Sequence, residues 1–120
     1  MSYNLTISIG RGTASGEYLR GSVWDDFRDD TVAVSDVALI VPGAQCVQYG
    51  TVTGVWDGET EESFTITVAG TDPDHVVYGP DEDVTLRALI ERLASGLAAR
   101  YRQECVAVSW YRPDLIPPPQ

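Results

Sequence analysis

The sequence predicts a single α+β domain with the ferredoxin-like order βαββαβ, in which two helices cover one face of a four-stranded antiparallel sheet. Three observations predict this fold: an alternating strand near the N-terminus, a hairpin signal mid-chain, and two segments whose apolar residues recur every three or four positions. The 120 residues suffice for one core. We expect the domain to span residues 1–112, with a proline-rich tail at 113–120.

The first strand is predicted by strict alternation. Tyr3, Leu5, Ile7 and Ile9 are separated by polar residues, which gives one buried face and one polar face. Residues 10–21 contain four glycines and no periodicity, so we expect a loop there.

The first helix is predicted to begin at Ser22, which stands where an N-cap residue belongs. Its apolar face is formed by Trp24, Phe27, Thr31, Val34, Ala38 and Val41. The helix should end before Pro42. Its second half is rich in β-branched residues, which fit a strand equally well.

A hairpin is predicted over residues 45–69, with its turn at Asp57-Gly58, a dipeptide that suits tight primed turns. If these two residues form the loop, the numbers of paired residues sum to 115. That register places Tyr49 opposite Ile66, and Val47 opposite Val68.

An acidic loop at 70–83 leads to the second helix, for which Asp83 is the expected cap. The apolar stripe of that helix consists of Leu86, Leu89, Ile90, Leu93, Leu97 and Tyr101. The last strand is expected from Cys105 to Trp110.

The sheet face without helices is predicted to carry small, uncharged and mildly polar side chains, which suggests that something covers this face. We expect it to form a homodimer interface that includes Thr6, Ser8, Thr65, Thr67, Ala107 and Ser109. A solvated sheet that is rich in threonine and serine because these suit strands is the alternative. Trp56 and Tyr111 are candidate exposed anchors of an interface, or else simple packing residues.

Charge and composition exclude several classes of function. With 18 acidic and 8 basic residues the formal charge is −10, so direct binding of nucleic acid is disfavoured. A host protein with a basic surface is a possible partner. No membrane span or secretory signal is found, and we expect a cytoplasmic protein that does not bind membranes. Cys46 and Cys105 are expected to be two buried thiols rather than a disulfide.

One glycine motif follows the first strand and precedes the first helix, the context in which phosphate-binding loops occur. Gly10, Arg11 and Gly12 form it, and with Arg112 they are the candidate residues for an anion. The spacing fits neither the dinucleotide fingerprint nor the P-loop, so a flexible strand exit is the alternative.

Catalytic and metal-binding constellations are not found in the sequence. His75 is the single histidine, so the usual zinc sets and a serine or cysteine nucleophile with its base have no support. The acidic residues of the 70–83 loop lack the EF-hand pattern. We therefore expect no catalytic residue, no metal and no cofactor.

Four segments carry a resemblance to a known group of proteins: residues 3–11 (YNLTISIGR), the pair Trp24 and Phe27, residues 56–64 (WDGETEESF) and residues 97–104 (LAARYRQE). They resemble small acidic proteins of actinobacteriophages, including those of mycobacteria, whose function is unassigned. The resemblance covers most of the chain and implies a setting in the cytosol of an infected bacterium. It assigns no functional residue.

The function predicted from the sequence is a non-enzymatic phage accessory protein that binds a host protein or interferes with a host defence. One alternative is a domain that binds or sequesters a small anionic ligand or nucleotide, with its pocket between the open sheet face and the glycine loop. Another is a minor component of the virion.

Overall fold

The computed structural model describes residues 2–56 and 58–119, and the side chains of residues 46, 56 and 59 lie outside the described part. The elements in chain order are β1 (Tyr3–Gly10), α1 (Gly21–Asp36), the 3₁₀ helix η1 (Val37–Ile40), β2 (Cys46–Trp56), β3 (Glu59–Thr71), β4 (Val76–Tyr78), β5 (Asp83–Thr85), α2 (Leu86–Arg100) and β6 (Ala107–Tyr111).

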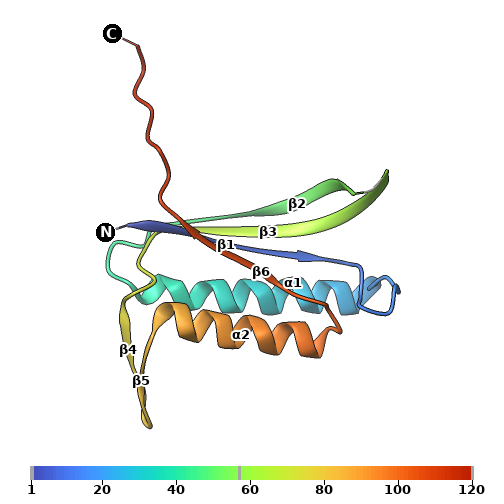
Figure 1. Cartoon of the computed structure of the whole chain (residues 1–120), viewed down its shortest axis with the longest axis horizontal. Coiled ribbons are helices and arrows are strands. Elements are labelled where there is room, and N and C mark those ends of the chain that lie inside the picture. The colour runs from blue at the N-terminus through green and yellow to red at the C-terminus, as the bar shows by residue number, and fades with distance from the viewer. Residues whose placement is uncertain (1, 57, 120) are drawn as a thin grey trace.

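The main sheet has the strand order β2-β3-β1-β6, and all its neighbouring strands are antiparallel. Both helices lie side by side against one face of this sheet (Figure 1). The predicted ferredoxin-like α+β architecture is confirmed. The β4–β5 ribbon, which the sequence did not predict, projects from the layer of helices, and the C-terminal segment runs away from the body of the protein (Figure 1).

The core lies between the sheet and the helices. The strands contribute Leu5, Ile7, Ile9, Phe64, Ile66 and Val68, and the helices contribute Trp24, Phe27, Val34, Leu86, Ile90 and Leu97, all of them buried. Phe27 is fully buried, and its ring stacks on that of Tyr101 at 4.3 Å between centroids. Burial of one such side chain stabilises the fold by about 1.5–3 kcal/mol.

The register of the hairpin is confirmed. Tyr49 pairs with Ile66 and Val47 with Val68, as the sum of 115 requires. Gly58 has a φ of +81°, the positive angle that a primed turn needs. The other predicted turn residue, Asp57, lies outside the described residues.

The predicted helix caps were wrong. Helix α1 begins at Gly21, and its N-cap residue, Arg20, makes no side-chain capping bond. Ser22 is therefore inside the helix. At α2 the cap is Thr85, whose hydroxyl accepts a hydrogen bond from the backbone N–H of Ala88 at 3.2 Å. Asp83 does not cap the helix because it is part of the short strand β5.

Helix α1 and η1 together reach Ile40, which agrees with the expected end before Pro42. The last strand begins at Ala107, two residues later than expected, and leaves Cys105 exposed outside it. The prediction of a buried Cys105 thiol is thus wrong, and Cys46 has no described side chain. None of the helices in the described part of the chain is long and apolar enough to cross a membrane.

Candidate functional site

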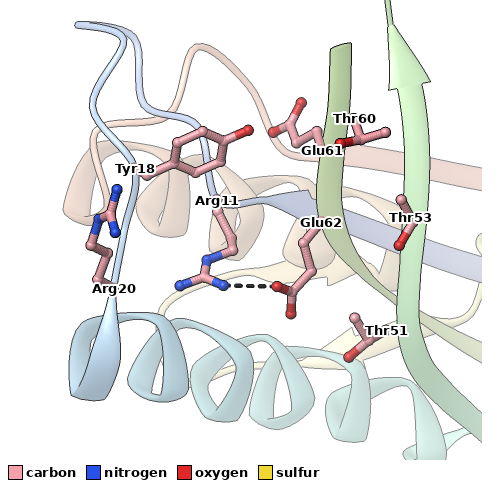
Figure 2. A pocket seen from close by; sticks show the side chains of 8 residues that line it. All are labelled: Arg11, Tyr18, Arg20, Thr51, Thr53, Thr60, Glu61 and Glu62. Carbon is pink, nitrogen blue, oxygen red and sulfur yellow. Dashed lines mark hydrogen bonds and ion pairs between the residues drawn. The ribbon is translucent and has the colours of Figure 1, made fainter.

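A cavity of about 500 Å³ lies between the β2–β3 hairpin and the segment that joins β1 to α1. We call it the hairpin cavity. Figure 2 shows Arg20 and Tyr18 on one side of it, and the hairpin's threonines and glutamates on the other. It is lined by Arg11, Tyr18, Arg20, Thr51, Thr53, Thr60, Glu61 and Glu62.

The segment that bears the cavity's basic residues is fixed by hydrogen bonds. The Leu19 N–H donates to the Arg11 carbonyl at 2.9 Å, and the Arg11 Nε donates back to the Leu19 carbonyl at 2.9 Å. Gly12 and Tyr18 form an isolated antiparallel bridge. Because Leu19 is buried in the core, the backbone that carries these polar side chains is anchored to the body of the domain.

Two of the charged groups in the cavity neutralise each other. Arg11 Nη1 lies 2.7 Å from Glu62 Oε2, and the Arg11 guanidinium lies 5.5 Å from the centre of the Trp24 ring. This cation–π contact and ion pair hold Arg11 in place. The charge of Arg11 is therefore already paired within the protein.

The other two charged groups keep their charge available. Arg20 is exposed and makes no ion pair within residues 2–56 and 58–119. Glu61 Oε1 accepts a hydrogen bond from the neutral Gly12 N–H at 3.3 Å and likewise has no basic partner in that part of the chain. The hairpin cavity thus offers a ligand one unpaired cation and one unpaired anion.

The four residues proposed for an anion are not brought together. The Gly12 N–H and the Arg11 guanidinium already have carboxylate partners, which would repel an anion. Gly10 ends β1, and a side-chain carbon built on it would meet the same Glu61 carboxylate. Arg112 follows Tyr111, whose partner Asn4 lies at the opposite end of β1.

On the open face of the sheet, the hydroxyl groups pair with one another. Thr6 and Thr67 lie 3.1 Å apart between their Oγ1 atoms, Ser8 Oγ lies 3.0 Å from Thr65 Oγ1, and Thr6 also donates to the Tyr111 hydroxyl at 3.4 Å. The hydrogen bond from Thr6, followed by those that Tyr111 makes with Asn4 and Thr67, lowers the pKa of Tyr111.

The other predicted interface residues of that face, Ala107 and Ser109, are exposed. The homodimer through this face stays a prediction. Tyr111 is 42% exposed, as an anchor would be, while the side chain of Trp56 lies outside the described part.

A second cavity of about 490 Å³ lies on the open face. We call it the face cavity, and it is lined by Ser8, Ile9, Gly10, Gly12, Thr13, Glu61, Ser63, Gln103, Glu104, Cys105 and Ala107. Glu61 borders both this cavity and the hairpin cavity. In the described part of the chain, no three histidine, cysteine or acidic residues gather where they could hold a metal ion.

Sequence reasoning missed most of the hairpin cavity. No motif links the 11–20 segment with the hairpin. One signal was present in the predicted register, which pairs Thr53 with Glu62. This pair lies on the same side of the hairpin as the apolar pair of Tyr49 and Ile66. Polar residues on the helix-facing side of a hairpin, close to its turn, indicate a lined cavity rather than core.

No protein-family model and no curated protein matches the sequence. Two solved structures resemble the fold. A phage SAM lyase in complex with S-methyl-5'-thioadenosine is 20% identical with a TM-score of 0.47, and the match covers 91% of this chain and 79% of that one. A phage SAM lyase in the apo state is 15% identical with a TM-score of 0.46, and the match covers 96% and 92%.

Both of these proteins are enzymes, and this finding corrects the prediction of a non-enzymatic accessory protein. Both are also named as phage proteins. The narrower likeness to actinobacteriophage proteins stays a prediction. A likeness at this level concerns the fold alone.

Proposed function

We propose that this chain is an enzyme that takes a small zwitterionic molecule into the hairpin cavity. One observation carries the proposal: the Arg20 guanidinium and the Glu61 carboxylate border the same cavity, and neither has an ion-pair partner among the residues that the structure describes. A ligand with a carboxylate and an ammonium group matches this pair of charges.

The rest of the cavity suits the same class of ligand. Its volume of about 500 Å³ falls within the range of small-molecule sites. Thr51, Thr53, Thr60 and Tyr18 supply hydroxyl groups that both donate and accept hydrogen bonds. A phenol and a carboxylate at one cavity are also groups that exchange protons with a bound ligand, as general acid–base catalysis requires.

The net charge of the protein narrows the ligand further. At a formal charge of −10 the protein attracts cations and repels anions over distances of about a Debye length. A ligand whose net charge is zero or positive is therefore favoured over a nucleotide. S-adenosylmethionine meets this condition, because it adds a sulfonium cation to an amino-acid zwitterion. We place the reaction in the cytosol of a phage-infected bacterium.

The test is calorimetric titration of the purified chain with S-adenosylmethionine, followed by mass spectrometry for S-methyl-5'-thioadenosine. We expect saturable binding and product formation by the unaltered chain. Arg20→Ala should weaken binding about tenfold, because it removes a charge-assisted contact.

The matched control is Arg92→Ala. Arg92 pairs with Glu82, does not line the hairpin cavity, and is 62% exposed, so its loss changes the net charge equally without touching the site. Binding that is unchanged in Arg20→Ala, or weakened equally by both variants, would overturn the proposal. The same holds if the unaltered chain binds neither S-adenosylmethionine nor L-methionine.

A further inference from the structure

The glycines of the 10–12 segment leave room for a side chain of the hairpin. A Cβ atom added at Gly10 would lie 2.5 Å from Glu61 Oε1, and one added at Gly12 would lie 3.2 Å from the same oxygen. Neither glycine has a positive φ, so backbone freedom does not explain them. Their lack of a side chain lets the Glu61 carboxylate lie against the backbone and accept the Gly12 N–H.

The neighbouring glutamate has a different environment. Glu62 points to the opposite side of β3, because successive side chains of a strand alternate, and its carboxylate is bound by Arg11 at 2.7 Å. A cationic ligand group at Glu62 would compete with a guanidinium that is already in place. At Glu61 it would add to a weak hydrogen bond from a neutral donor.

We infer that Glu61 is the residue that selects the ammonium group of the ligand, and that Gly10 and Gly12 are positioning residues that hold its carboxylate at the edge of the hairpin cavity. This inference rests on the proposed function and deepens it. It also assigns the glycine motif a role opposite to phosphate binding: the motif seats an anion of the chain itself, which in turn recognises a cation.

The experiment uses three probes that differ in one group each: L-methionine, 3-(methylthio)propylamine, which lacks the carboxylate, and 4-(methylthio)butanoate, which lacks the ammonium group. We expect Glu61→Gln to weaken binding of the two ammonium-bearing probes about tenfold and to leave binding of the butanoate unchanged. The matched control is Glu82→Gln, which removes an equal charge from an ion-paired carboxylate that does not line the cavity, and it should preserve the preference for the ammonium-bearing probes.

Gly10→Ala tests the positioning role. The added Cβ meets only the flexible end of the Glu61 side chain, so the protein should fold while the carboxylate shifts, and the preference for L-methionine over the butanoate should fall. Gly50→Ala is the control, because Gly50 also lies in a strand and nothing lies within 4 Å of its added Cβ.

The outcomes separate the two claims. If the unaltered chain binds L-methionine and Glu61→Gln keeps the full preference for ammonium, the inference is overturned and the proposed function stands. If the unaltered chain binds none of the three probes and no S-adenosylmethionine, the proposed function fails and the inference fails with it. If the preference for ammonium is lost in Glu62→Gln and kept in Glu61→Gln, the role belongs to Glu62 and the inference is refuted.

Discussion

Replacement of Tyr101 by phenylalanine should destabilise the protein at neutral pH and lose that effect in alkali. The Tyr101 hydroxyl donates to Asp30 Oδ2 at 2.5 Å, and Arg100 Nη1 lies 3.2 Å from the same oxygen. A hydrogen bond to a charged acceptor contributes about 1.5–3 kcal/mol, and the partial exposure of Asp30 sets the expectation at the lower end, about 1.5 kcal/mol. The stack of the ring on Phe27 is kept in Tyr101→Phe, so only the hydroxyl is tested.

The pH dependence has a definite sign. Burial, together with the Asp30 carboxylate, raises the pKa of Tyr101 from 10.0 to about 12. Between these values the unfolded chain loses the phenolic proton and the folded chain keeps it. The unfolded state then binds fewer protons, so the free energy of unfolding falls as the pH rises. The stabilising contribution is complete below pH 10 and is lost as the pH passes through the folded pKa of about 12.

Urea unfolding at several pH values, from 8 to 12, measures this effect in the unaltered chain and in Tyr101→Phe. We expect a difference in the free energy of unfolding of about 1.5 kcal/mol at pH 8. The rise of the Tyr101 pKa from 10.0 to about 12 corresponds to about 2.7 kcal/mol of linked protonation, so the difference should fall to about zero near pH 11 and reverse its sign by pH 12. Two curves that stay parallel across this range would refute the argument, because the hydroxyl would then have no linked protonation.

Three further changes test the packing and the backbone by urea or thermal unfolding. Phe27→Ala should cost about 3–5 kcal/mol because it empties a fully buried site, whereas Leu115→Ala, at an 85% exposed position, should stay within about 0.5 kcal/mol of the unaltered chain. Thr85→Ala should cost about 1 kcal/mol by removing the cap of α2, and an unchanged midpoint would contradict that role. Gly70→Ala should destabilise the protein by more than about 1 kcal/mol, since its φ is +77° and the new Cβ would lie 2.6 Å from a backbone oxygen, while Gly96→Ala inside α2 should stabilise it by about 0.5–1 kcal/mol.

The fold could be predicted because its determinants are local and periodic. The alternation in β1 defines which face is buried, and the Asp57-Gly58 signal alone was enough to set Tyr49 opposite Ile66. The sheet order then follows from connections that a βαββαβ chain allows.

The helix caps could not be predicted to the residue, because the path of the preceding segment decides at which residue the helix begins. Ser22 has the right chemistry for a cap, but Leu19 is drawn into the core, and the helix begins at Gly21. Asp83 likewise belongs to strand β5, so the residue that caps α2 is Thr85.

The site could not be predicted because its parts are distant in sequence and carry no fixed spacing. Arg20 and Glu61 border one cavity only because the 11–20 segment folds against the hairpin. The glycine motif was predicted to bind an anion, whereas the role that we infer for it depends on a contact that the sequence does not reveal, that of the Gly12 N–H with Glu61.

The most direct measurement of the central claim is a crystal structure of the chain with L-methionine. The account predicts a ligand in the hairpin cavity, with its carboxylate at the Arg20 guanidinium and its ammonium group at the Glu61 carboxylate. A ligand seated elsewhere, or one in this cavity with its carboxylate turned away from Arg20, would contradict the account.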